Sequence, residues 1–141
     1  MQHDDLMLIR ASGIVTGRYA VWKPSHGVPI RTTVGSPRFW RGPPLVDGRR
    51  LAPWGLLDPE LPTDVCRQRY EQRLDELGDE VIELLERIAE DHDGERLVLL
   101  CFENVHRGEF CHRRWLAEWI EDRYGIVVPE LPEGSQQPTL F

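Results

Sequence analysis

Side chains that could do chemistry are concentrated between residues 101 and 114, where an apolar run ends and a helical pattern begins. They are Cys101, Glu103, Asn104, His106, Arg107, Cys111, His112, Arg113 and Arg114. A thiol at a helix start beside arginines has a lowered pKa, and therefore a larger fraction of the reactive thiolate. Cys111 is thus the predicted nucleophile. Its proton could be carried by His112, Glu103 or His106.

The same stretch could also form an anion-binding site. Arginine side chains hold phosphates and carboxylates, and the unpaired N–H groups at a helix start favour negative charge. We predict that Arg113 contributes to such a site, together with Arg31 and Arg38 from the first part of the chain. Arg114 could equally lie along the surface with its charged end in water.

Other interpretations of the cysteines stay open. Cys101 lies deep in an apolar run and could be a buried small hydrophobic residue. It could also form a redox pair with Cys111, if the two elements bring the sulfurs together. A zinc ion could be held by Cys101, His106, Cys111 and His112. Their spacing differs from that of paired zinc knuckles, and adjacent ligands are awkward, so we expect no metal and no other cofactor.

The elements around this stretch predict an α/β fold. Arg96–Glu103 is a continuous apolar run, typical of a central strand buried on both faces. Phe110–Tyr124 predicts a helix, with Gly125 as its C-terminal stop. Ile126–Leu131 predicts a further strand, which Pro129 restricts to a sheet edge. Together they make a βαβ unit, so we expect a small, mostly parallel sheet flanked by helices, with ligands beyond the carboxyl ends of its strands.

The first part of the chain predicts little regular structure. Leu6–Ser12 is a short apolar run with β character, so we expect a strand there. Gly13–Pro62 is a long irregular segment rich in proline, glycine and arginine. Within it, only Val28–Gly35 has the β-branched density of a strand.

The middle of the chain predicts two helices. Thr63 or Asp64 can cap the first, and Gly78 interrupts the pattern before Asp79 caps the second. The second helix has a regular apolar stripe. Its acidic residues are expected to form a solvated face: Glu80, Glu83, Glu86, Glu90 and Asp91.

The length of 141 residues predicts a single domain over residues 1–131 and a flexible tail over residues 132–141. The net charge of −7 is unevenly distributed, because residues 1–57 hold eight Arg and Lys against three Asp, which gives +5 and leaves −12 for the rest. Without a membrane span or a signal-peptide pattern, we expect a cytoplasmic protein with no membrane partner. Three cysteines, an odd number, argue against a disulfide scaffold.

The sequence LLCFENVHRGEFCHRRWLAEWIEDRYG resembles the signature of the bacterial and phage family called domain of unknown function 488. In that family a hydrophobic strand ends in Cys-x-Glu, and Cys-His-Arg opens a helix about nine residues later. VPIRTTVGSPRFWRGP and RRLAP resemble the branch of the family with a short N-terminus. The resemblance covers about residues 29–131. It implies a small α/β domain with Cys101, Glu103, Cys111, His112 and Arg113 at its site, and it implies no particular reaction.

The last five residues, Gln137-Pro138-Thr139-Leu140-Phe141, resemble the pentapeptide by which bacterial proteins bind the DNA sliding clamp. Leu140 and Phe141 would fill a hydrophobic pocket on the clamp, and Gln137 would form a hydrogen bond at its rim. A tail that folds back onto its own domain is the other interpretation.

Three functions follow from these features. The first is an enzyme of DNA or nucleotide metabolism that uses Cys111, with the Arg-rich segment as a surface for nucleic acid or a nucleotide. The second is an interaction protein that binds the clamp without chemistry. The third is a structural module built on thiols or zinc. The sequence leaves open whether the chain is an enzyme.

Overall fold

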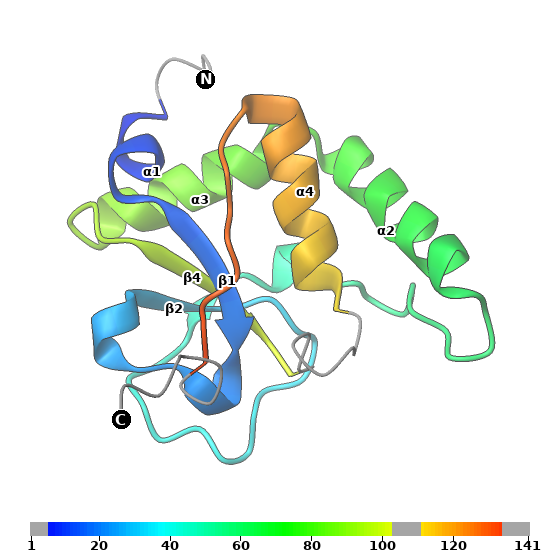
Figure 1. Ribbon diagram of the computed structural model, residues 1–141, viewed down its shortest axis with the longest axis horizontal. Coiled ribbons are helices and arrows are strands. Elements are labelled where there is room, and N and C mark those ends of the chain that lie inside the picture. The colour runs from blue at the N-terminus through cyan, green and yellow to red at the C-terminus, as the bar shows by residue number, and fades with distance from the viewer. Residues whose placement is uncertain (1–5, 103–110, 134–141) are drawn as a thin grey trace, which may run out of the picture.

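The computed structural model describes residues 6–102 and 111–133, and the fold within them is α/β, as the sequence predicts. Its centre is a four-stranded sheet in which every neighbouring pair is parallel, in the order β1-β4-β2-β3 (Figure 1). The strands are β1 (Ile14–Arg18), β2 (Val28–Arg31), β3 (Val46–Asp47) and β4 (Leu97–Cys101).

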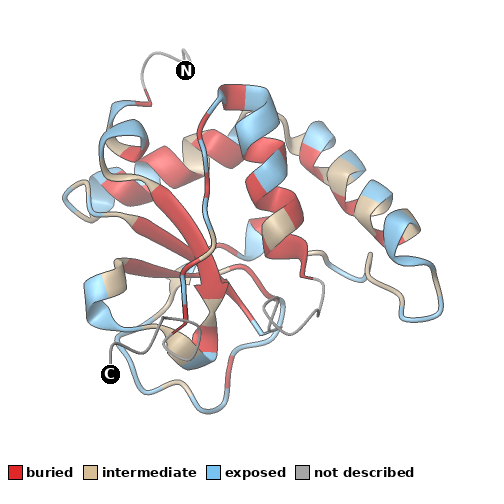
Figure 2. Cartoon of the chain, in the orientation of Figure 1, coloured by how far each residue is buried: buried red, intermediate tan, exposed pale blue. Residues whose placement is uncertain are grey.

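The predicted central strand is confirmed as β4, which lies between β1 and β2. All five of its residues are buried, as Figure 2 shows in red. Leu97 and Leu99 pack into a core formed with the helices, whereas Val98 and Leu100 pack on the opposite face, against the loops. Because both faces are covered, the strand is apolar at every position instead of alternating.

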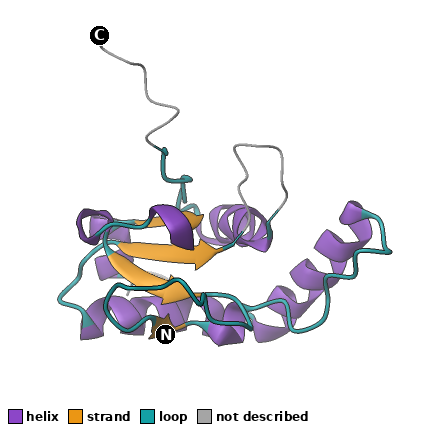
Figure 3. Ribbon diagram, turned by 90° about the horizontal axis from the view of Figure 1, so that it is seen from below, coloured by secondary structure: helices purple, strands orange, loops and turns teal. Residues whose placement is uncertain are grey.

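The predicted helices are also confirmed. They are α2 (Thr63–Leu77), α3 (Glu80–Asp91) and α4 (His112–Tyr124), and α2 extends outward at one edge of the molecule (Figures 1 and 3). Gly125 ends α4 in the left-handed conformation, with a φ of 70°, as expected of a C-terminal glycine. Among the described residues, no helix has the length and apolar character that a bilayer crossing requires.

The predicted helix caps are wrong in their chemistry. Pro62 is the N-cap of α2, and neither α2 nor α3 has a side-chain hydrogen bond at its cap. Asp79 does lie at the N-cap of α3, but its carboxylate accepts a hydrogen bond from the Tyr124 hydroxyl at 2.6 Å. The contact with α4 therefore competes successfully with local capping.

Residues predicted to form a first strand form a short helix, α1 (Met7–Ser12). The reason lies far away in the sequence: the Glu86 carboxylate accepts hydrogen bonds from the backbone N–H groups of Leu8, at 3.1 Å, and Ile9, at 3.0 Å. Glu86 is only 6% exposed, so it also departs from the solvated face predicted for the acidic residues of α3. A buried carboxylate on α3 thus supplies acceptors that α1 lacks within its own sequence.

The irregular segment contains a strand that the sequence did not indicate, β1. Gly17 interrupts its β-branched pattern, but the glycine has a packing role, because a Cβ at this position would lie 3.1 Å from a methyl group of Leu131. Three short 3-10 helices also lie in this segment, at Tyr19–Val21, Pro24–His26 and Arg49–Leu51.

The predicted strand over residues 126–131 is reduced to a single bridge. Thr16 of β1 pairs with Glu130 in parallel, and backbone hydrogen bonds join Thr16 to Pro129 and Leu131. The segment lies at the sheet edge, as predicted, because Pro129 has no N–H with which to extend a ladder. Since β4 pairs with β1 on its other side, the segment that follows α4 forms the edge beside β1 and places Glu130 next to Thr16.

Candidate thiol site at the carboxyl end of the central strand

Two of the three cysteines meet where β4 ends and α4 begins. Cys101 is the last residue of β4, Cys111 is the N-cap of α4, and a disulfide joins them with their Cα atoms 7.4 Å apart. Both are buried, with exposed fractions of 0% and 2%. Of the interpretations left open by the sequence, the structure contains the cysteine pair, and the third cysteine, Cys66, is a free, buried thiol.

His112 lies beside this pair, with its two ring nitrogens in different environments. Nε2 is 2.9 Å from the carbonyl oxygen of Thr32, which can only accept, so Nε2 carries the proton. Nδ1 is therefore the basic nitrogen, and it lies 3.8 Å from the sulfur of Cys111. The Tyr70 ring packs edge-on against the imidazole, with centroids 5.5 Å apart.

The imidazole of His112 is neutral at physiological pH. Burial lowers the pKa of His112 to about 4, and the nearby Arg113 guanidinium adds to the shift, whereas the hydrogen bond to the Thr32 carbonyl opposes it. A neutral ring has a lone pair at Nδ1 that can accept a hydrogen bond. Nδ1 of His112 is therefore positioned as a hydrogen-bond acceptor next to Cys111.

Arg113 is fully buried, with an exposed fraction of 0%. Its guanidinium forms a two-pronged ion pair with the Glu130 carboxylate, through Nε at 3.0 Å and Nη2 at 2.7 Å. The remaining prong, Nη1, donates to the sulfur of Cys101 at 2.7 Å. The residue predicted to bind an external anion is therefore bound by a carboxylate of the same chain and directs one donor at a site sulfur.

Thr16 and Arg114 complete the network around Glu130. The Thr16 hydroxyl donates to the Glu130 carboxylate at 2.6 Å and accepts from Arg114 Nη1, also at 2.6 Å. Arg114 further donates to the carbonyl of Val128 at 2.9 Å. Sequence reasoning missed Thr16 and Glu130 as site residues. One signal for Glu130 was available: it lies inside a run predicted to be a strand. A carboxylate that is buried there needs a charge or hydrogen-bond partner.

Of the other predicted site residues, the structure describes Arg31 and Arg38, and neither has a hydrogen bond to a cysteine among the described residues. Arg31, at the end of β2, donates to the carbonyl of Thr33 at 3.1 Å and to that of Val34. Arg38 is exposed in the loop that follows β2. Glu103 and His106 lie outside the described residues, as do the tail residues Gln137, Leu140 and Phe141.

The cysteine pair and His112 also form a potential set of metal ligands. One ligand atom from each of Cys101, Cys111 and His112 falls within 4.8 Å of the others. The Nε2–H of His112 bonded to a carbonyl is the arrangement typical of a histidine that binds metal through Nδ1. Three ligands are one fewer than a structural zinc requires, and the fourth candidate, His106, is not described.

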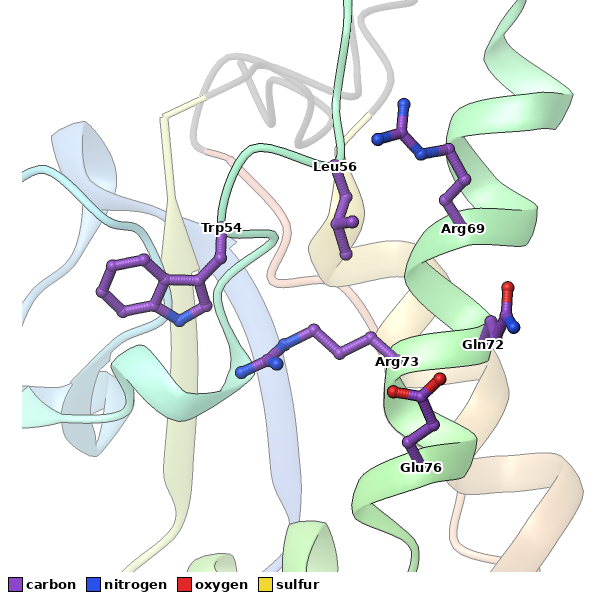
Figure 4. Close-up of a pocket in the computed structure, with 6 residues that line it drawn as sticks. All are labelled: Trp54, Leu56, Arg69, Gln72, Arg73 and Glu76. Atoms are coloured by element: carbon purple, nitrogen blue, oxygen red, sulfur yellow. The ribbon is translucent and has the colours of Figure 1, made fainter.

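A separate hollow of about 290 Å³ lies between α2 and the loop before it (Figure 4). Its lining residues are Trp54, Leu56, Arg69, Gln72, Arg73 and Glu76. The Arg73 side chain reaches from α2 toward Trp54 in Figure 4, and its Nη2 donates to the backbone carbonyl of Arg50 at 2.9 Å. None of the residues predicted for the thiol site lines this hollow.

The fold and the site define a class: a small α/β domain with a parallel sheet and a cysteine pair at the carboxyl end of its central strand. Residues 44–120 match the family described as Domain of unknown function DUF488, and since they are 77 of the 141 residues (120 − 44 + 1), the chain belongs to this family. The family resemblance predicted from the Cys-His-Arg signature is thereby confirmed. No curated protein and no solved structure matches the chain.

The matched range contains only part of the candidate site. It contains both cysteines, His112 and Arg113, but it begins after β1 and β2 and ends before Glu130. The carboxylate that binds Arg113 and the carbonyl that orients His112 therefore come from residues on either side of the matched range.

Proposed function

We propose that this chain is a thiol-dependent protein in which Cys111 is the nucleophile and Cys101 is its disulfide partner. The observation that carries the proposal is the position of Cys111: its sulfur is paired with Cys101 and lies 3.8 Å from the basic nitrogen of His112. A helix N-terminus and a nearby base both favour the thiolate form of a cysteine. A cytoplasmic location, which the sequence predicts, would make this disulfide transient and reactive.

The chemistry proposed is thiol–disulfide exchange with a small disulfide as co-reactant. In the reduced protein, the Cys111 thiol faces Nδ1 of His112 and loses its proton to water, and the thiolate attacks one sulfur of the co-reactant and releases the other as a thiolate, which takes up a proton. The Cys101 thiolate, stabilised by Arg113 Nη1, then attacks the sulfur of Cys111 in the mixed disulfide. The internal disulfide forms, the second thiolate leaves, and the co-reactant is reduced by two electrons.

Oxidised glutathione tests which cysteine attacks first. The reduced Cys101→Ser variant should form a mixed disulfide at Cys111, because the nucleophile remains and its partner is absent. The reduced Cys111→Ser variant should form such an adduct at least about 10-fold more slowly, since Cys101 has neither the helix N-terminus nor the nearby His112 nitrogen that favour the thiolate of Cys111. Intact-mass spectrometry of acid-quenched samples measures both rates.

Cys66→Ser is the matched control, because Cys66 is buried but takes no part in the disulfide. This variant should form the Cys101–Cys111 disulfide at the rate of the unaltered chain. Equal adduct rates in the Cys101→Ser and Cys111→Ser variants would contradict the assignment of Cys111 as nucleophile.

A metal module is the alternative use of the same atoms, supported by the three ligand atoms within 4.8 Å. If that alternative holds, the reduced chain will bind one zinc ion, lose it in the His112→Gln variant and unfold when a chelator is added. If thiol exchange is the function, zinc will not protect the cysteines from glutathione.

A second candidate function, recruitment to DNA through the bacterial sliding clamp, is supported by the pentapeptide at residues 137–141. Glu133, the last described residue, is held by Arg18 through hydrogen bonds of 2.9 and 2.8 Å, and the pentapeptide follows four residues later. Short motifs with apolar anchor residues bind hydrophobic pockets on partner proteins.

Clamp binding makes a direct prediction. The full chain should bind a purified bacterial clamp, and the Leu140→Ala/Phe141→Ala variant should bind at least about 10-fold more weakly, because both apolar anchors are removed. Thr139→Ala, at a variable position of the motif, is the control. Isothermal titration calorimetry measures all three, and equal affinity for the double variant would exclude the motif as the binding element.

A further inference from the structure

A hollow of about 530 Å³ lies at the carboxyl edge of the sheet, and four of its nine lining residues are aromatic. We name it the aromatic hollow; the lining residues that matter here are Tyr19, Trp22, Phe39, Trp40, Arg41 and Gly42. Tyr19 and Trp22 follow the end of β1, and the others belong to the loop between β2 and β3. This is the edge at which parallel sheets bind their ligands.

Three of the four rings that line the hollow form one connected cluster with Phe102. The centroid of the Tyr19 ring lies 6.1 Å from that of Trp40 and 4.9 Å from that of Phe102, and the Trp22 and Trp40 centroids are 5.2 Å apart. Phe102 directly follows Cys101, so the cluster extends from the hollow to the residue beside the thiol site.

Hydrogen bonds fix the orientation of the two indoles. Trp22 Nε1 donates to the carbonyl of Gly27 at 3.1 Å, and Trp40 Nε1 donates to that of Pro43 at 2.7 Å. A Cβ at Gly42 would lie 2.8 Å from Trp40 and 3.1 Å from Trp22, so only glycine allows the loop to approach both rings. The hollow is therefore built by a specific loop conformation around preoriented rings.

Part of this aromatic surface faces water. Phe39 is 52% exposed and Phe102 is 44% exposed. Both belong to the few large apolar side chains that the described residues leave in solvent, and Figure 2 shows much of the loop between β2 and β3 as exposed. Phe39 lines the hollow, and an exposed aromatic ring in such a position is typical of a binding surface.

The charge around the hollow is positive. The sequence contains no Asp or Glu from Leu6 to Val46, whereas it contains Arg10, Arg18, Lys23, Arg31, Arg38 and Arg41 in that range. Arg41 lines the hollow and Arg38 lies three residues before it, and both are exposed. Neither has a hydrogen bond or ion pair among the described residues, whereas Arg18 is neutralised by Glu133.

We propose that the aromatic hollow binds single-stranded nucleic acid, with bases stacked on Phe39 and its neighbouring rings and phosphates held by Arg38 and Arg41. A single strand offers both the flat faces and the regularly spaced charges that this surface complements. A duplex offers only the charges, because its base faces are stacked inside. The proposal does not depend on thiol chemistry, and it concerns residues that no thiol step uses.

The test measures the fluorescence anisotropy of a labelled 15-nucleotide oligothymidylate against the disulfide-containing full chain. We expect binding that weakens as salt is raised, and a blunt duplex of equal length should bind at least about 10-fold more weakly. Phe39→Ala should weaken binding of the single strand by about 5- to 150-fold, the range measured for one base–aromatic stack. Since Phe39 is half exposed, this variant should fold normally, which circular dichroism checks.

The salt dependence of oligonucleotide binding tests whether Arg38 and Arg41 contact phosphates. In the Arg38→Gln/Arg41→Gln variant, the slope of log K against log salt should become shallower by about 1.4, because each phosphate contact on a single strand contributes about 0.7. Arg87→Gln, an exposed arginine on α3, and Met7→Ala, an exposed apolar residue on α1, are the matched controls and should bind as the unaltered chain does.

Three results would overturn the proposal. One is an oligothymidylate that does not bind at low salt. Another is equal binding of duplex and single strand that Phe39→Ala leaves unchanged, which would reduce the interaction to charge alone. The third is a nucleoside triphosphate that competes at the affinity of the oligonucleotide, which would make the hollow a nucleotide pocket. The titration is repeated with the reduced chain. Equal binding by the reduced and disulfide-containing chains would show that a failure of the thiol chemistry does not affect the proposal for the aromatic hollow.

Discussion

Replacing Arg113 with methionine is expected to lower the free energy of unfolding by about 3–5 kcal/mol. The change removes both prongs that hold Glu130, whose side chain is only 11% exposed, and leaves a carboxylate with its main charge partner gone. It also removes the donor to the sulfur of Cys101. Urea denaturation of the disulfide-containing protein, followed by circular dichroism, measures the effect.

Two further variants show whether the loss comes from the unpaired charge. The double change Arg113→Met/Glu130→Met should recover most of the stability, because an apolar pair of similar volume needs no compensation. Arg123→Met removes a guanidinium that faces Asp79 at 3.9 Å with both side chains well exposed, and should cost at most about 1 kcal/mol. A loss below about 1 kcal/mol for Arg113→Met would contradict the structural role given to this pair.

The stability of the folded chain should also fall as the pH is lowered from about 6.5 to about 4, by at most about 3 kcal/mol. Burial lowers the pKa of His112 to about 4 in the folded protein, whereas the unfolded chain titrates near the ordinary value of 6.5. Between these two values the unfolded chain binds the proton and the folded chain does not, so acid favours unfolding. The contribution is complete above pH 6.5 and is lost on the way down to pH 4.

Urea titrations at several pH values, with the disulfide intact, measure this dependence. The groups facing the imidazole are the Arg113 guanidinium, which lowers its pKa further, the Thr32 carbonyl and the Tyr70 ring. His112→Gln keeps a nitrogen donor for the Thr32 carbonyl but cannot titrate, so it should flatten the dependence in this window. His26→Gln, which alters a histidine on the surface loop, should keep most of the slope. If the free energy of unfolding depends on pH equally in both variants, His112 is not the cause of the pH dependence.

The sequence predicts the elements whose signals are local. The apolar run of β4 and the αL glycine at Gly125 each follow from a few adjacent residues, and both are confirmed. Leu6–Ser12 was assigned wrongly, because the acceptors that stabilise α1 come from Glu86 in another helix. The strand β1 was missed, because its partner β4 and the side chain that requires Gly17, Leu131, lie far along the chain.

The same distinction applies to the site. Residue types and the strand–helix junction predict that Cys101, Cys111, His112 and Arg113 belong together, and the structure brings these four side chains into contact or close approach. The sequence could not show that Arg113 is occupied by Glu130, or that a carbonyl of the β2 loop determines which nitrogen of His112 is basic. Those facts depend on tertiary partners, which adjacent residues do not encode.

The strand order has a consequence for how the chain acquires its fold during synthesis. β1 and β2 do not pair with each other: β1 pairs with β4, and β2 pairs with both β4 and β3, so Ile14 and Val28 share Leu97 of β4 as their partner. A ribosome must therefore release about two-thirds of the chain before β1 can pair with β4 and before β2 gains its second neighbour, and loops this long close slowly. Until then β1 has no strand partner, so this part of a nascent chain is accessible to chaperones and prone to aggregation.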